Sequence, residues 1–289
     1  MQTITVPDGR QLGYTEMGDP DGIPVIYQHG WQYPRLWHPD VEIAREAGVR
    51  LLCLDRAGYG ESTLQPDRSM TDSAGDVTAL ADQLGIDRFA VLGWSLGGLH
   101  ALAAAAAMPQ RVTHVVACGS LGLIDEPGAL RQLSWISAMP RRLRHVPVLQ
   151  RAWLKLQGGQ VTKDVTAFVD GSIRHFSPPD QAVMRDPLFR PVIEESQAVA
   201  WADGVDGILA DYNSAAPLAF QMSQVPQHVD LVHGAADTIV DVAMARRLDE
   251  LLRDSRLQVL PDAGHFAVLT HWEQLIGLVA TTARETQQQ

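Results

Sequence analysis

A serine flanked by two glycines, in Gly93-Trp94-Ser95-Leu96-Gly97, could supply a nucleophile. It lies between an apolar run that predicts a strand over 89–92 and an alanine-rich run that predicts a helix over 96–108. Glycines on both sides of a serine allow a tight turn from strand to helix, because they remove Cβ atoms that would collide there. The motif is weak by itself in a chain with 24 glycines, but its position between strand and helix favours Ser95 as a nucleophile.

A serine hydroxyl needs a base to remove its proton, and that base needs a third group that fixes its tautomer and stabilises its cation. His265 lies in a turn-rich loop after a predicted strand over 257–260, and Asp237 follows a predicted strand over 228–233. Both residues are therefore expected at the carboxyl ends of strands, the edge at which open α/β sheets bind ligands. The order along the chain is serine, acid, histidine.

The acid has two competitors. Asp241 lies one helical turn beyond Asp237, and Asp262 lies beside the histidine loop. We predict that Asp237 is the acid and keep both competitors as alternatives. For His265, the alternative is a loop histidine with a structural role.

The elements that must position these residues alternate along most of the chain. The first 28 residues predict a hairpin and a third strand, and short apolar runs then alternate with helical patterns as far as residue 117. This alternation predicts an α/β fold with a mostly parallel central sheet and helices on both faces. It stops over 121–224, where helical patterns predominate, and resumes afterwards. We predict a core domain from 1–120 and 225–289, with a helical cap over 121–224 inserted after the sixth core strand.

The chain resembles the α/β-hydrolase superfamily, specifically its capped, serine esterase-like branch. The features that match are His29-Gly30, the loop over 55–62, GWSLGG over 93–98, Asp237 and Gly264-His265. They extend from about residue 28 to residue 271. The resemblance implies the α/β-hydrolase fold and a Ser95–His265–Asp237 triad.

The resemblance also implies an oxyanion hole made by the backbone N–H groups of Trp31 and Leu96. It implies that His29 holds its loop and transfers no proton, and that the loop over 55–62 is scaffold. Similar haloalkane dehalogenases and epoxide hydrolases have an aspartate nucleophile where this chain has Ser95. The serine therefore disfavours those two reactions and favours an acyl-enzyme intermediate.

These features predict a serine hydrolase that cleaves a carboxylic ester, lactone or thioester of a moderately sized, largely apolar small molecule, with no metal or organic cofactor. Three alternatives on the same fold are a cofactor-free oxygenase, a carbon–carbon bond hydrolase and a perhydrolase. An alternative of another class is a ligand receptor with little turnover.

The predicted cap would cover Ser95 and help to select the substrate. Candidate pocket residues are Trp94, Trp135, Trp153, Trp201 and Phe266. Any of the cap tryptophans could instead form the cap's own core, because a small helical layer must bury apolar side chains. Five basic residues without an acid lie over 141–155. They predict a solvated helix face, with a surface that attracts anionic substrates as the alternative.

Composition excludes several other classes. The chain has 289 residues and a net charge of −11, which disfavours nucleic acid as a partner. It has no apolar run of 18 residues, so we expect no integral membrane association, and its first residues lack an export pattern, so we expect a cytoplasmic protein. Cys53 and Cys118 lie in apolar runs and predict two buried thiols without a disulfide. No pattern indicates an oligomeric state.

Overall fold

The computed structural model describes residues 2–35 and 40–287. The strands in these residues are β1 (Gln2–Thr5), β2 (Gln11–Gly18), β3 (Ile23–Gln28), β4 (Val49–Leu54), β5 (Phe89–Trp94), β6 (Val112–Cys118), β7 (Val229–Gly234) and β8 (Ser255–Leu260). They form one sheet in the order β1-β2-β4-β3-β5-β6-β7-β8. Only the pairs β1–β2 and β2–β4 are antiparallel, and the other neighbours run parallel. The prediction of a mostly parallel α/β sheet is confirmed.

The central strands are apolar along their whole length because helices cover both faces of the sheet. Every residue of β5, β6 and β7 is buried. Cys53 in β4 and Cys118 in β6 are both buried free thiols, as the sequence predicts. Burial raises the pKa of each thiol, so neither is disposed to ionise.

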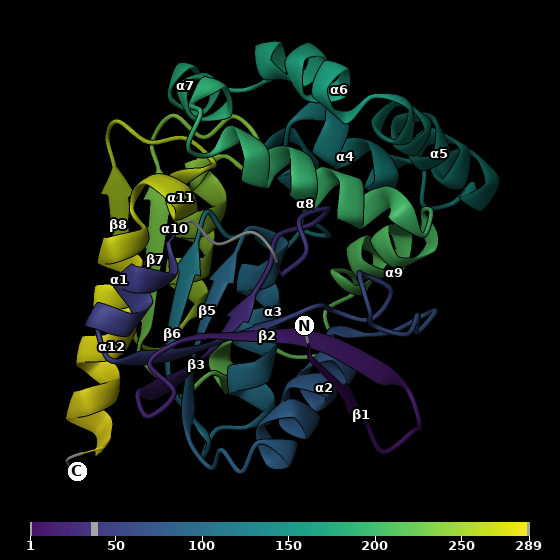
Figure 1. Cartoon of the computed structure of the whole chain (residues 1–289). Helices are drawn as coiled ribbons and strands as arrows, with labels where there is room; N and C mark the ends of the chain where they lie inside the picture. Colours follow the sequence, from purple (N-terminus) through teal and green to yellow (C-terminus); the bar gives the residue numbers. More distant parts are fainter. Residues whose placement is uncertain (1, 36–39, 288–289) are drawn as a thin grey trace.

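Two groups of helices enclose the sheet (Figure 1). The core on one face contains buried side chains from α2 (Met70–Gln83), α3 (Leu96–Ala107) and α10 (Val242–Leu251). The core on the other face contains side chains from α1 (Val41–Glu46), α11 (Ala267–Thr270) and α12 (Trp272–Gln287). In the described part of the chain, every helix is too short or too polar to cross a bilayer.

Between β6 and β7 the chain is helical. We call residues 121–224 the cap segment. Its helices are η1 (Ala129–Arg131), α4 (Trp135–Arg142), α5 (Pro147–Lys163), α6 (Val165–Ser172), η2 (Ile173–His175), α7 (Pro178–Arg185), α8 (Arg190–Ala202), α9 (Asp206–Ser214) and η3 (Met222–Gln224). Figure 1 shows α4 to α8 on the side of the sheet toward which the parallel strands point. The segment therefore lies over the edge at which Ser95 stands.

A buried ionic cluster joins the cap segment to the sheet. Asp211 in α9 accepts hydrogen bonds from the Arg56 guanidinium at 2.7 and 2.8 Å, from Arg68 at 2.7 Å and from the Tyr59 hydroxyl at 3.1 Å. Asp211 and both arginines are buried. Burial favours the neutral carboxyl, but the charges of Arg56 and Arg68 outweigh it and hold the pKa of Asp211 well below its usual value. The two basic side chains of the core thus fix the position of α9.

Candidate active site

Ser95 occupies a strained turn between β5 and α3. Its backbone has φ 56° and ψ −122°, a conformation that non-glycine residues adopt rarely. The neighbouring glycines are required by close approach, because a Cβ at Gly97 would overlap the backbone of Gln28 and one at Gly93 would overlap Gly97 itself. The turn leaves Ser95 partly exposed between buried neighbours, which presents its hydroxyl to the cap segment.

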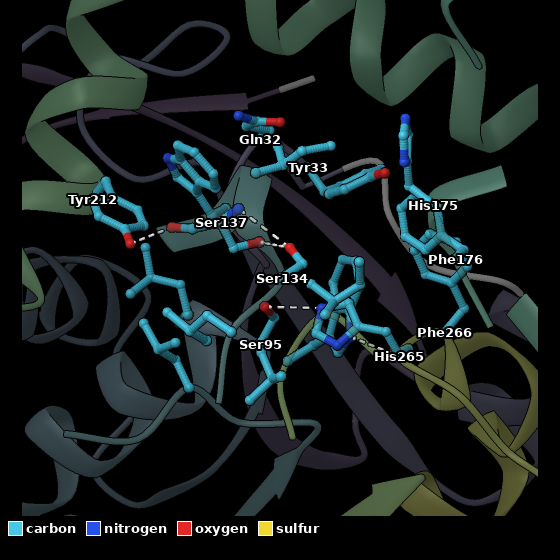
Figure 2. Close-up of a pocket in the computed structure, with 18 of the residues that line it drawn as sticks. Gln32, Tyr33, Ser95, Ser134, Ser137, His175, Phe176, Tyr212, His265 and Phe266 are labelled. Carbon is cyan, nitrogen blue, oxygen red and sulfur yellow. Dashed lines mark hydrogen bonds between the residues drawn. The ribbon is translucent and has the colours of Figure 1, made fainter. Parts of the chain in front are cut away.

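The structure brings Ser95, His265 and Asp237 into one line of hydrogen bonds. Figure 2 shows the part of this line between Ser95 and His265. Nε2 of His265 lies 3.1 Å from Oγ of Ser95, and Nδ1 of His265 lies 2.8 Å from Oδ2 of Asp237. Oδ1 of Asp237 accepts the backbone N–H groups of Ile239 at 2.8 Å and Val240 at 2.9 Å. A carboxylate held on both oxygens orients the imidazole so that Nδ1 carries the proton and Nε2 faces the serine.

The other two candidate acids lie elsewhere. Asp241 caps α10 and accepts the backbone N–H of Ala243 at 2.8 Å. Asp262 is exposed to solvent in the loop after β8. Of the three candidates, Asp237 is the one that contacts His265.

Burial and charge set the protonation states of the pair. Burial lowers the pKa of His265, but the charge and hydrogen bond of Asp237 outweigh it, with a further contribution from Asp180, and the pKa is raised above 6.5. Burial raises the pKa of Asp237, but His265 and His233 more than compensate and hold it below the usual range. Asp237 is therefore an anion near neutral pH, and it stabilises a cation on His265.

Two backbone N–H groups near Ser95 are available to a ligand. Those of Trp31 and Leu96 donate no hydrogen bond to another residue that the structure describes. Leu96 is the first residue of α3, where N–H groups lack partners within the helix and the helix dipole is positive.

The His29 side chain holds its loop through two hydrogen bonds. Its Nδ1 donates to the Gly30 carbonyl at 2.7 Å, and its Nε2 accepts the backbone N–H of Arg56 at 3.1 Å.

A cavity of about 150 Å³ opens over Ser95. Lining residues from the core include Trp31, Trp94, Ser95, Leu96, His265 and Phe266. Lining residues from the cap segment include Ser134, Trp135, Ile136, Ser137, Phe176 and Tyr212. Figure 2 shows Ser134 and Ser137 above Ser95. Among the described residues, no group of three or more His, Cys, Asp or Glu side chains is arranged to hold a metal ion.

Two of the five predicted pocket residues lie outside this lining. Trp201 is 1% exposed and packs with Leu154 and Val161 in an apolar cluster of the cap segment. Trp153 packs against the same cluster, and the centroid of its ring lies 5.5 Å from that of Trp135. Neither of these two predicted pocket residues lines this cavity, because a thin helical layer must form a core of its own. Trp94, Trp135 and Phe266 do line the cavity.

The sequence patterns missed the polar side of the cavity. Ser134 donates a hydrogen bond to the Ser137 hydroxyl at 2.9 Å, and Tyr212 donates to the Ser137 carbonyl. These residues belong to no motif, and the only available signal was the serine that begins a helical pattern, since Ser134 caps α4.

The basic stretch over 141–155 does not reach the cavity. Arg141 is buried, forms an ion pair with Asp125 and donates to the Ala216 carbonyl at 3.3 Å. Arg151 pairs with Asp206 at the surface. The remaining members, Arg142, Arg144 and Lys155, are exposed. The structure thus favours a paired and solvated helix face over a substrate-attracting surface.

A model of the protein family described as the alpha/beta hydrolase fold matches residues 23–271. The chain belongs to this family. The match includes β3 to β8, the cap segment and all three residues of the hydrogen-bonded line. For an α/β-hydrolase, a serine at the turn after β5 is the expected place for a nucleophile.

The chain is also similar to curated relatives and to solved structures. The chain is 26% identical over 264 residues to pimeloyl-[acyl-carrier protein] methyl ester esterase of Aliivibrio salmonicida, covering 89% of this chain and 90% of the relative. It is 35% identical over 120 residues to non-heme chloroperoxidase of Streptomyces lividans, covering 40% and 43% of the two chains. A thermophilic esterase from Thermogutta terrifontis superimposes with a TM-score of 0.72 at 21% identity over 99% of each chain, which shows a shared fold.

Proposed function

We propose that this protein is a serine hydrolase that cleaves a carboxylic ester, or a related lactone or thioester, through an acyl-enzyme intermediate. The observation that carries the proposal is the line of hydrogen bonds from Ser95 through His265 to Asp237, at the floor of a cavity with apolar walls. The esterase names of the full-length relatives support the same reaction class.

In this proposal Ser95 Oγ attacks the ester carbonyl while Nε2 of His265 takes its proton. The same nitrogen returns that proton to the alcohol that leaves. Water then attacks the acyl-enzyme with His265 again as the base, which releases the acid and regenerates Ser95. Asp237 stabilises the imidazolium, and the N–H groups of Trp31 and Leu96 bind the negative oxygen of the tetrahedral intermediates.

We further propose that residues 1–120 and 225–289 form the catalytic domain and that 121–224 form a cap that selects the substrate. An apolar cavity of about 150 Å³ accepts a group as large as a benzene ring. Trp135, Phe176 and Phe266 supply apolar surface of this kind. A compact apolar acyl or alcohol group, with one polar substituent near Ser134 and Ser137, suits this site best.

Labelling with a fluorophosphonate and a panel of p-nitrophenyl esters tests the reaction class. We expect one equivalent of label on Ser95 and turnover that falls as the acyl chain lengthens, because the cavity is small. Ser95→Ala should abolish both and leave the melting temperature nearly unchanged. A labelled residue other than Ser95, or turnover that survives Ser95→Ala, contradicts the proposal.

The match to the chloroperoxidase favours one second candidate. Over the matched 120 residues the identity is 35%, above that of the esterase relative. If hydrogen peroxide replaces water in the second step, the acyl-enzyme releases a peracid. Adding peroxide to the ester assay and measuring peracid against acid distinguishes the two outcomes.

A further inference from the structure

A carboxylate of the cap segment holds the loop that carries His265. Oδ2 of Asp180, in α7, accepts the backbone N–H of His265 at 2.9 Å, and Oδ1 accepts the backbone N–H of Phe266 at 2.8 Å. The Ser177 hydroxyl donates to Oδ2 at 2.8 Å and so orients the carboxylate. Asp180 is 1% exposed, so these bonds form away from solvent.

The histidine loop is shaped to receive this carboxylate. A Cβ at Gly264 would overlap the carboxyl group of Asp180, so the glycine before His265 permits the close approach. On its other side the loop is held by the core, since the Trp94 indole donates to the His265 carbonyl at 2.9 Å. The backbone of His265 is thus held by α7 at its N–H and by β5 at its carbonyl.

We infer that Asp180 is a positioning residue for His265: the cap segment, through this carboxylate, sets the place of the base relative to Ser95. The inference rests on the proposed function, in which His265 is the base. It gives the cap a second task besides forming the cavity wall. His175 and Phe176, which line the cavity, directly precede Ser177, so a substrate seated against them contacts the turn that leads into α7.

Asp180 also brings negative charge near the imidazole. The side chain of His265 faces Asp237 on its Nδ1 and Ser95 on its Nε2, with His233 behind Asp237. Its backbone is bonded to Asp180 at the N–H and to the Trp94 indole at the carbonyl. The charge of Asp180 contributes to the raised pKa of His265. Burial raises the pKa of Asp180 itself, against the effect of the two N–H donors. Replacing this carboxylate by an amide therefore removes charge as well as one acceptor.

The test compares Asp180→Asn with Asp203→Asn, which removes a charge from an exposed position of the same segment. Steady-state kinetics on a short-chain ester and an NMR titration of the His265 imidazole are measured for both variants and the wild type. In Asp180→Asn we expect kcat to fall about tenfold or more, since small displacements of a catalytic group are costly. KM should change little, because Asp180 does not line the cavity. The pKa of His265 should fall, and Asp203→Asn should match the wild type in all three measurements.

A folded Asp180→Asn protein with wild-type kcat and an unchanged pKa of His265 overturns the inference. If that variant does not fold, Ser177→Ala decides, because it frees the Asp180 carboxylate from one donor without removing it. A lower kcat at constant KM then supports positioning, and a lower melting temperature with unchanged kcat overturns it. If the wild type neither turns over esters nor reacts with the fluorophosphonate, the proposed function fails, whereas the imidazole titration still tests the influence of Asp180.

Discussion

At the scale of residues, the site depends on two groups that burial alone would neutralise. His265 and Asp237 are both buried. His265 lowers the pKa of Asp237, which keeps the carboxylate ionised, and Asp237 raises the pKa of His265, which stabilises the imidazolium. Nδ1 of His265 and Oδ2 of Asp237 are 2.8 Å apart, and the acid is held by two further backbone donors. The reactivity of Ser95 is therefore a property of this set and not of the serine alone.

Asp237→Asn should reduce kcat by roughly 10³- to 10⁴-fold, because an amide at this position favours the wrong tautomer of the histidine. Asp241→Asn and Asp262→Asn should stay close to wild type, since neither side chain contacts His265. Steady-state rates on one ester for the three variants make the comparison. The acid assignment is wrong if either control loses activity to the same degree as Asp237→Asn.

The pH dependence of kcat/KM should follow the protonation state of His265. Its pKa in the folded protein is raised above 6.5, and the neutral form is the base, so kcat/KM should rise with pH through an apparent pKa above that value. Raising the pH thus removes the proton that blocks catalysis. Rates between pH 5 and 9 with an ester of constant charge measure this limb. A midpoint clearly below 6.5 would contradict the assignment of the base.

At the scale of elements, the cap segment has one set of side chains that form the site and another that stabilises the segment. Trp135 is 49% exposed at the cavity, whereas Trp201 is 1% exposed within the helices. The Asp211 cluster adds a charged connection between α9 and the sheet. Substitutions in the first set should therefore alter the kinetic constants, and substitutions in the second set should alter the stability.

Trp201→Ala should lower the free energy of unfolding by about 3–5 kcal/mol, because it leaves a cavity in a small core. Trp135→Ala should leave stability within about 1 kcal/mol of wild type and raise KM, because this ring lies at the cavity and is half exposed. Urea denaturation and KM for an aromatic ester measure both effects. A stable Trp201→Ala protein with a raised KM would place Trp201 in the site after all.

Asp211→Ala should cost about 3–5 kcal/mol at pH 7, since it leaves Arg56 and Arg68 buried without a counter-charge. The pKa of Asp211 is depressed in the folded state, so its contribution is fully present above its ordinary value of 3.8 and is lost as the pH falls below that value. Asp206→Ala, which removes a surface ion pair with Arg151, is the control and should cost less than about 1 kcal/mol. Equal losses of unfolding free energy in the two variants would show that the buried cluster stabilises the protein no more than a surface ion pair does.

At the scale of the whole molecule, the charge of −11 is not offset near the site by the basic residues over 141–155. Two of them form ion pairs with Asp125 and Asp206, and none lines the cavity. A negatively charged ester should therefore be repelled by the protein as a whole, and added salt should weaken this repulsion.

For an anionic ester, kcat/KM should rise with ionic strength, whereas for a neutral ester of matched size it should stay constant. The double variant Arg142→Gln, Arg144→Gln should show the same two salt dependences as the wild type. Rates measured between 20 mM and 500 mM salt test this, because the Debye length falls from about 20 Å to about 4 Å over that range. A rate for the anionic ester that falls with salt in the wild type alone would show that the basic stretch attracts substrate.

The sequence alone determined the features of this protein that follow from local backbone geometry and from the period of its apolar residues. The glycines around Ser95 mark a turn that few residues can make, and runs of buried strand and amphipathic helix mark the sheet and its layers. Tertiary structure decided which of three acids meets His265, which tryptophans line the cavity, and that Asp180 holds the histidine loop. The hydrogen bonds of Asp237 and Asp180 to the histidine loop join residues that are 28 to 86 positions apart. No local pattern specifies them, because they depend on how the loops after β7 and β8 meet and on how the cap segment packs on the sheet.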